Sequence, residues 1–181
     1  MTIVPALSRL QEEHARFLEL FVMHQCGLMA LDLKRARLAL DLVVHEIAVH
    51  AALEDEVLMP IFEASAGAIE GGRPELFHAE HRKLTSLLAL LSVALAGLEG
   101  QRTVEPREAL ALVEMGFTFK HLWDHHTKRE DAVFYPKLDQ LLGGDEHELE
   151  RSAVWKRLDA ADRAARERLG SPPPPYLVDF R

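Results

Sequence analysis

The chain has 181 residues, of which 48% are apolar and 28% charged, and its formal net charge is −8. This size and composition predict one compact domain, and the acidic balance argues against nucleic-acid binding, which requires a basic surface. A single cysteine excludes an internal disulfide, and no apolar run approaches the roughly 20 residues of a membrane span. We therefore expect a cytoplasmic protein that binds neither nucleic acid nor membrane.

Long segments rich in Leu, Ala, Glu and Arg alternate with short stretches that contain Gly, Pro or Asp, which is typical of an all-helical protein. In chain order, we predict helices over residues 4–29, 33–64, 74–98, 105–142 and 146–169. Residues 1–142 are predicted to form an up-down-up-down four-helix bundle. Residues 143–181 are predicted to form an additional C-terminal helix and a proline-rich extended tail, packed on or beside the bundle.

Each of the first four helices has an apolar stripe with the spacing of a buried seam. Polar residues interrupt every stripe at a similar level, although buried charge is costly unless it is paired or bound to a metal. The four stripes are Leu10, His14, Phe17, Phe21; then Val43, Ile47, His50, Glu54, Val57, Ile61; then Phe77, His81, Leu84, Leu88, Leu91, Leu95; then Leu112, Met115, Phe119, Leu122, His126, Glu130, Val133.

The polar residues follow a pattern that occurs twice. A lone His, preceded by Glu, is followed on the next helix by His-x-x-x-Glu-Asp and then by a proline. Side chains four residues apart on a helix can reach the same point, and antiparallel folding about turns near residues 33, 67 and 104 brings both copies to one level. The predicted layer contains His14, His50, Glu54, His81, His126 and Glu130. Four imidazoles and two carboxylates in a dry core suit a pair of transition-metal ions, particularly iron.

This six-residue pattern resembles the hemerythrin-like, or His-His-Glu cation-binding, domain family over residues 10–140. The resemblance implies two non-heme iron ions in a carboxylate- and oxo-bridged diiron centre, with zinc or manganese as substitutes. It also implies four terminal histidine ligands, with Glu54 and Glu130 as bridges. Oxygen carriers of this family use two histidines from the third helix, whereas the partner of His81 here would be Phe77 or Thr85, which leaves a coordination position open or filled from elsewhere.

The resemblance further implies a protein that binds or senses dioxygen or a related small oxidant in a cavity walled by Phe17, Phe21, Leu84 and Leu122. An oxidative or nitrosative defence enzyme acting on peroxide or nitric oxide is an alternative, as is iron storage or sensing. A helical interaction module that binds no metal is a further alternative. The motif leaves open whether the protein is an enzyme and whether it forms a homodimer.

Several acidic positions have alternatives. Asp131 competes with Glu130 as the second bridge, and Asp55 likewise competes with Glu54. Glu13 and Glu80, which precede the lone histidines, either accept a hydrogen bond from a ligand or, as we prefer, face solvent.

The remaining histidines are also open. His78 is a candidate additional ligand, although we favour a place at the helix boundary. His24, His45 and His121 form either a second polar cluster with a subsidiary metal site or, as we prefer, three separate histidines. Cys26 is expected to be a small core residue.

Overall fold

The computed structural model describes residues 5–65, 72–143 and 148–170, and every regular element in these ranges is helical. The predicted extended tail lies outside the described residues. The elements in chain order are α1 (Pro5–Met29), α2 (Leu33–Leu53), η1 (Glu54–Leu58), α3 (Met59–Ser65), α4 (Pro74–Glu99), α5 (Pro106–Arg129), η2 (Glu130–Phe134), α6 (Tyr135–Leu142) and α7 (Glu148–Leu169). The all-α fold class is therefore confirmed.

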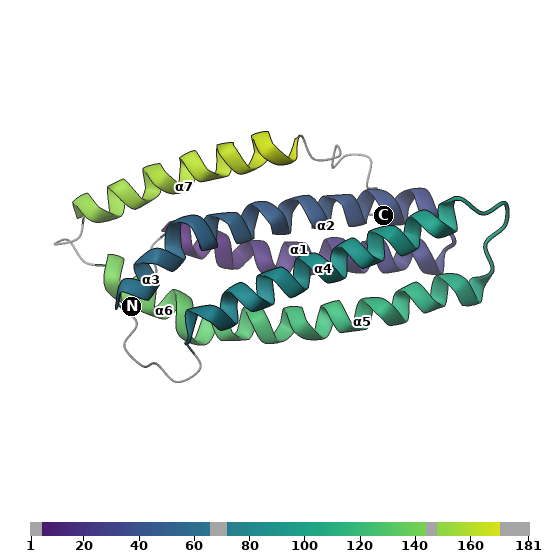
Figure 1. Cartoon of the computed structure of the whole chain (residues 1–181), viewed down its shortest axis with the longest axis horizontal. Coiled ribbons are helices and arrows are strands. Elements are labelled where there is room, and N and C mark those ends of the chain that lie inside the picture. The colour runs from purple at the N-terminus through teal and green to yellow at the C-terminus, as the bar shows by residue number, and fades with distance from the viewer. Residues whose placement is uncertain (1–4, 66–71, 144–147, 171–181) are drawn as a thin grey trace.

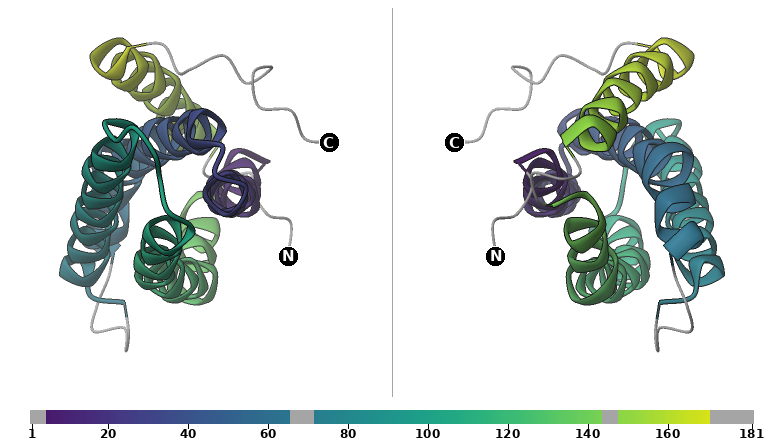
Figure 2. Two further views of the ribbon diagram at one scale, coloured as in Figure 1. Left: turned by 90° about the vertical axis from the view of Figure 1, so that its right-hand side faces the viewer. Right: turned by 90° about the vertical axis from the view of Figure 1, so that its left-hand side faces the viewer.

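Helices α1, α2, α4 and α5 lie side by side along the long dimension of the molecule (Figure 1). Each packs against two of the others, in the cyclic order α1, α2, α4, α5 (Figure 2). Helix α7 runs along the outer side of α2, where Arg166 contacts Glu46 and Arg168 contacts Glu56. The cyclic packing brings one face of each of the four long helices to a common interior.

The turn between α1 and α2 is set by local chemistry. Asp32 caps α2 by accepting a hydrogen bond from the Arg35 backbone N–H, and Leu31 adopts a positive φ of 56°. The two helices approach closely at Gly27, where an added Cβ would lie 2.7 Å from the backbone nitrogen of Ala36. Any larger residue at position 27 would push the helices apart.

The apolar core consists of two clusters on either side of a polar layer. One fills the end near the α1–α2 turn and includes Phe21, Leu40 and Leu95. The other fills the opposite end and includes Phe62 and Phe134, together with residues of α7. Buried histidines and glutamates lie between them, so the level predicted from the interrupted stripes is a real boundary in the core.

The helices predicted over residues 33–64 and 105–142 each contain a π-helical turn, which the sequence pattern did not indicate. In η1 the backbone N–H of Met59 bonds to the carbonyl of Glu54, and in η2 that of Tyr135 bonds to the carbonyl of Glu130. Both turns precede a proline, which has no N–H to donate to a regular helix.

These wider turns shift the buried stripe by one residue. We predicted that Ile61 and Val133 would continue the seams, but the fully buried residues are Phe62 and Phe134, while Ile61 and Val133 are only partly buried. A π turn holds one more residue than an α turn, so everything beyond it is rotated relative to a regular 3.6-residue period. The stripes of α1 and α4 contain no such turn, and their predicted residues are buried.

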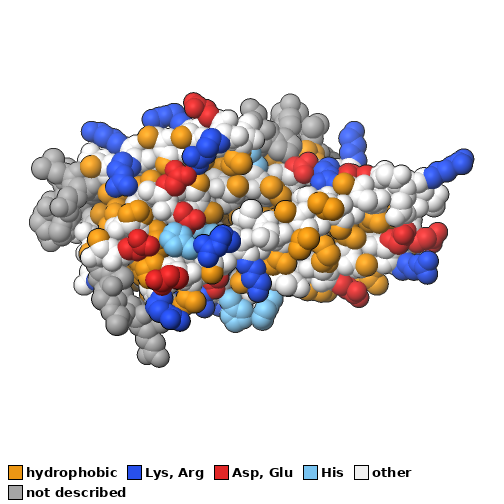
Figure 3. Space-filling view, in the orientation of Figure 1, with side chains coloured by type: hydrophobic (Ala, Val, Ile, Leu, Met, Phe, Trp, Pro, Cys, Tyr) orange, Lys and Arg blue, Asp and Glu red, His pale blue; other side chains and the backbone are white. Residues whose placement is uncertain are grey.

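Among the described helices, α4 is long and apolar enough, by length and composition alone, to cross a membrane, with 33% of its most apolar window buried. This differs from the expectation that no apolar run reaches such a length. The signal is weak, because core helices of soluble proteins give it too. Leu90 and Val93 of this helix are exposed. Hydrophobic side chains are scattered among charged ones over the face of the molecule seen in Figure 3.

Candidate metal centre

The six residues predicted to share one level converge in the interior of the molecule. Two sets of four donors each have ligand atoms within 4.8 Å of one another, and all of these residues are buried. The first set is His14, His50, Glu54 and Glu130, and the second is Glu54, His81, His126 and Glu130. Both carboxylates belong to both sets, which is the arrangement that two neighbouring ions sharing two bridging carboxylates would need.

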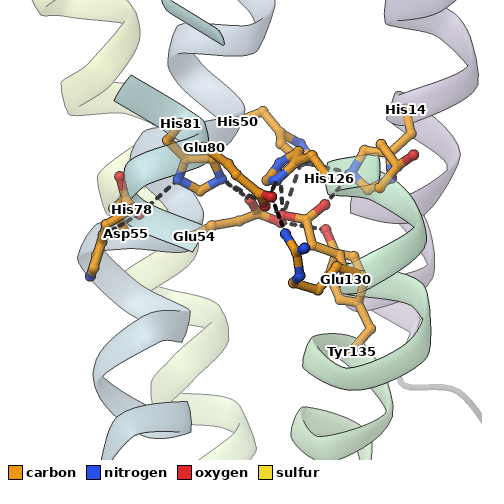
Figure 4. A network of polar contacts seen from close by, with 12 residues as sticks. His14, His50, Glu54, Asp55, His78, Glu80, His81, His126, Glu130 and Tyr135 are labelled. Carbon is orange, nitrogen blue, oxygen red and sulfur yellow. Dashed lines mark hydrogen bonds and ion pairs between the residues drawn. The ribbon is translucent and has the colours of Figure 1, made fainter. Parts of the chain in front are cut away.

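Each of the four long helices contributes to this cluster (Figure 4). Nε2 of His14 lies 3.0 Å from Nε2 of His50 and 3.3 Å from a carboxylate oxygen of Glu130. On the other side, Nε2 of His81 lies 3.2 Å from Glu54, and Nε2 of His126 lies 2.9 Å from Glu130. All four Nε2 atoms therefore point at the same pair of carboxylates.

The donor atoms at the centre of the cluster fit a metal site better than a hydrogen-bond network. Oε2 of Glu54, Nε2 of His81 and both carboxylate oxygens of Glu130 are buried without a hydrogen-bond partner of acceptable geometry. Buried polar atoms are normally hydrogen-bonded, and leaving one unpaired costs about 1–3 kcal/mol. Metal ions that accept these lone pairs would remove that cost, so the residues present fit a bound cation.

Three of the four histidines are held by carboxylates through their outward-facing nitrogens. Nδ1 of His50 pairs with Glu13 at 3.1 Å, and Nδ1 of His126 pairs with Glu80 at 3.2 Å. Glu80 also accepts a hydrogen bond from Arg129. This pattern is typical of metal-binding histidines, because the carboxylate fixes the ring orientation and increases the basicity of the nitrogen that faces the ion.

The expectation that Glu13 and Glu80 face solvent is therefore wrong. Each lies directly before a lone histidine on the same helix but reaches across to the histidine of the neighbouring helix, and Glu80 is largely covered. The direction of a side chain on its own helix does not reveal such a contact, because the contact depends on how closely the neighbouring helix approaches.

The third histidine held by a carboxylate is His81, whose partner is Asp55, the residue after Glu54. Asp55 accepts from Nδ1 of His81 at 2.8 Å and from Nδ1 of His78 at 2.9 Å. His78 therefore contacts the carboxylate that holds His81 and does not enter either donor set. Asp131 lies outside the donor sets as well, because its carboxylate accepts a hydrogen bond from Gln11.

Two aromatic residues at the site were missed. The Tyr135 hydroxyl donates a 2.5 Å hydrogen bond to Oε1 of Glu54, and Trp123 packs edge-on against the ring of His14 at 5.5 Å between centroids. The only sequence signal for Tyr135 was its place five residues after Glu130, before a proline. Of the predicted cavity walls, Phe17 packs 5.3 Å from His50, whereas Phe21 stacks instead on Phe119 at 4.4 Å, farther along α1.

In the absence of metal, the negative charge of the two buried carboxylates is balanced by protons on nearby histidines. Burial opposes a charge on His50, but Glu54 and Glu13 raise its pKa to about 10. Burial likewise opposes a charge on His81, but Asp55 and the two central carboxylates raise its pKa to about 12. The charged histidines in turn hold the pKa of Glu54 well below its usual value, against the effect of burial. Protons on these imidazoles thus neutralise the buried carboxylates.

His14 behaves differently from these histidines. Burial lowers its pKa below 6.5, and the nearby His50 lowers it further. His14 is therefore held in the neutral form, which is the form that binds metal.

The other histidines do not form a second cluster. Nδ1 of His24 contacts the backbone oxygen of Ala36, and Nε2 of His45 contacts that of Gly170. His121 lies on the surface beside His125. Within the ranges that the structure describes, no metal-binding group includes any of them, so the preferred interpretation of three separate histidines agrees with the geometry.

Cys26 is exposed, which corrects the expectation that it packs in the core. The stripe of α1 continues through its neighbours His24, Gln25 and Gly27, and these residues take the buried positions.

The fold and the site define an all-helical protein with a buried histidine and glutamate cluster suited to cations. Comparison with protein families identifies the relationship: the hemerythrin HHE cation-binding domain model matches residues 6–138 and, in a second match, residues 73–171. The chain belongs to this family. No curated protein and no solved structure gave a significant match.

Proposed function

We propose that this chain holds two iron ions between His14, His50, His81 and His126, with Glu54 and Glu130 shared between them. The main support is that both buried carboxylates belong to both donor sets, and that Oε2 of Glu54 and both oxygens of Glu130 are buried without a hydrogen-bond partner. Nitrogen and carboxylate donors without cysteine suit iron, and zinc or manganese are substitutes with similar preferences. The proposed architecture is an up-down-up-down bundle over residues 1–142, with residues 143–181 as an added C-terminal helix and tail.

We further propose that the centre binds or senses dioxygen or a related small oxidant in a cytoplasmic setting. When bound, a pair of iron ions supplies two redox-active sites that can accept a small exogenous ligand. The residues around it hold the ligands in place: Glu13, Asp55 and Glu80 orient three imidazoles. Phe17 and Trp123 cover the same layer with apolar rings, which limits access of water to it.

The decisive experiment is metal analysis and an optical spectrum of the full chain purified aerobically. We expect about two irons per chain and an absorption spectrum that changes reversibly when oxygen is removed and returned. A protein with less than one metal ion per chain would contradict the proposal. Turnover of peroxide or nitric oxide, without a stable oxygen-dependent spectrum, would instead identify a defence enzyme.

A further inference from the structure

Two surface pockets are each lined by one histidine of the candidate centre. A pocket of about 500 Å³ between α2 and α4 touches His81, and one of about 310 Å³ between α1 and α5 touches His14. These two histidines are also the most exposed members of the cluster, at 5% and 7%, compared with 2% for His50 and 1% for His126. Among the described residues, each lone histidine therefore lies beside a pocket that opens to the surface.

The pockets occupy equivalent places in the two sequence repeats. Ala51 follows His50 in the α2–α4 pocket, and its counterpart Thr127 follows His126 in the α1–α5 pocket. Thr85, four residues after His81, has Leu18 as its counterpart, four residues after His14. The repeat thus provides an internal comparison of the same pocket built from different side chains.

The α2–α4 pocket is wider because its walls are smaller. Three alanines line it on α2, namely Ala48, Ala51 and Ala52. In the α1–α5 pocket, Asp124 and Thr127 replace two of these alanines, and the Trp123 indole lies against the histidine itself. A large aromatic ring thus lies beside His14, although His14 is slightly more exposed than His81, and within the described ranges no Phe, Tyr or Trp lines the α2–α4 pocket.

The lining of the α2–α4 pocket also indicates what it admits. Asp55 is already paired with His81 and His78, and Glu56 with Arg168, so the carboxylates of the lining are neutralised and leave no strong attraction for ions. The Thr85 hydroxyl donates to the backbone oxygen of His81 at 2.9 Å, and its side chain is therefore directed along its own helix. The pocket volume of about 500 Å³ leaves ample room for a neutral molecule of a few atoms, which needs no charged partner on the way.

We propose that exogenous ligands reach the centre through the α2–α4 pocket beside His81, and that the α1–α5 pocket beside His14 is not the route. The ligand class is a neutral molecule of two to four atoms that binds a transition-metal ion directly, such as dioxygen, nitric oxide or hydrogen peroxide. This inference rests on the proposed metal-binding function. It adds the side of the bundle from which the ligand enters and the expectation that the ligand is uncharged.

The test measures how fast nitric oxide associates with the full chain loaded with ferrous iron under anaerobic conditions, followed by stopped-flow absorption. Ala51→Leu and Thr85→Leu narrow the α2–α4 pocket from opposite walls, and Thr127→Leu is the matched control at the repeat-equivalent position. We expect the first two variants to associate roughly fivefold or more slowly and the control to stay within about twofold of the parent. Because Thr85 is on the surface, its variant keeps the test usable if Ala51→Leu folds poorly.

The iron content of each variant, measured beforehand, separates the two proposals. If every variant holds iron but Ala51→Leu and Thr85→Leu bind nitric oxide at the parent rate, or Thr127→Leu alone is slow, the route is wrong and the metal-binding function stands. If the parent chain takes up no iron or, once loaded, does not bind nitric oxide, the proposed function is wrong, and the route is overturned with it.

Discussion

Two helical repeats supply the cluster, and they surround the same ligands differently. In the repeat built from α1 and α2, Asp55 after Glu54 pairs with His81 of the other repeat. In the repeat built from α4 and α5, Asp131 after Glu130 accepts a hydrogen bond from Gln11, and within the described residues no carboxylate pairs with Nδ1 of His14. The residue five positions after the glutamate is Met59 in one repeat and Tyr135 in the other. The donors have stayed equivalent while their supports have diverged.

This difference implies that the two donor sets differ in how their histidines are supported and reached. His81 is fixed by a carboxylate and lies beside the wider pocket, whereas His14 lies under Trp123. A hydrogen-bonded imidazole is a better-oriented and more basic ligand than a free one. Substitutions at paired positions can therefore reveal which differences matter.

The largest effect is expected from the shared carboxylates. Glu54→Ala and Glu130→Ala should each lower the content of both ions by roughly tenfold or more, because each carboxylate belongs to both donor sets. His14→Ala, which affects one set, should retain about one ion per chain. Metal analysis of the purified variants checks this, with Asp131→Ala as the control. If one glutamate variant retains both ions, the two carboxylates do not play equal roles.

The next effect concerns the two aspartates. Asp55→Asn should weaken metal affinity about tenfold, since removing a carboxylate that orients a histidine ligand typically costs this much. Asp131→Asn should change it by less than about twofold, because that carboxylate contacts Gln11. Titration against a competing chelator measures both. Equal losses would show that the repeats are supported in the same way.

Tyr135→Phe should destabilise the metal-free protein by about 1.5–3 kcal/mol, because a buried hydrogen bond to the Glu54 carboxylate is lost. The loss should be smaller in the metal-loaded protein, where the ion contacts the carboxylate. Met59→Leu, at the equivalent position of the other repeat, should cost less than about 1.5 kcal/mol in both forms. Denaturant unfolding with and without metal distinguishes these outcomes, and a loss independent of metal would indicate a packing effect alone.

The smallest expected effect is on pH dependence. Because the folded protein raises the pKa of His50 from 6.5 to about 10, the stability that this histidine provides is complete below pH 6.5 and is lost as pH rises through 10. The melting temperature of the metal-free chain should fall by about 4 °C or more between pH 7 and 10.5.

His14→Ala provides the contrast, because His14 is neutral when folded and should not contribute to that alkaline loss. His50→Ala should reduce it. Thermal unfolding followed by circular dichroism across this pH range is the measurement. A melting temperature that stays flat to pH 10.5 in the parent chain would mean that protons on the imidazoles do not balance the buried carboxylates.

Much of this architecture is predictable from the sequence because two independent patterns agree. Gly, Pro and Asp mark the turns, so the helix bounds differ from prediction by at most two residues at the described ends. Folding the first four helices about these turns brings the histidines to one level. The cluster around Glu54 and Glu130 follows from this geometry alone. Their roles as bridges remain a prediction until metal is measured.

The supporting contacts were not predictable in the same way. Glu13 pairs with His50 across a helix boundary, and the direction of such a contact depends on how closely two helices pack and how they are rotated. The shift from Ile61 to Phe62 has a different origin: a stripe extrapolated at 3.6 residues per turn fails where the turn is wider. In both cases the missing information is the relative rotation of neighbouring segments.

The π-helical turn at Glu54 links metal binding to the packing of the far end of the molecule. In a regular helix, Phe62 would point about 80° away from Glu54 around the helix axis. A regular helix could therefore direct the carboxylate to the centre or the aromatic ring to the core, but not both. The extra residue in the turn removes that conflict, and the second repeat has the same wider turn between Glu130 and the fully buried Leu138, which lies eight residues later like Phe62.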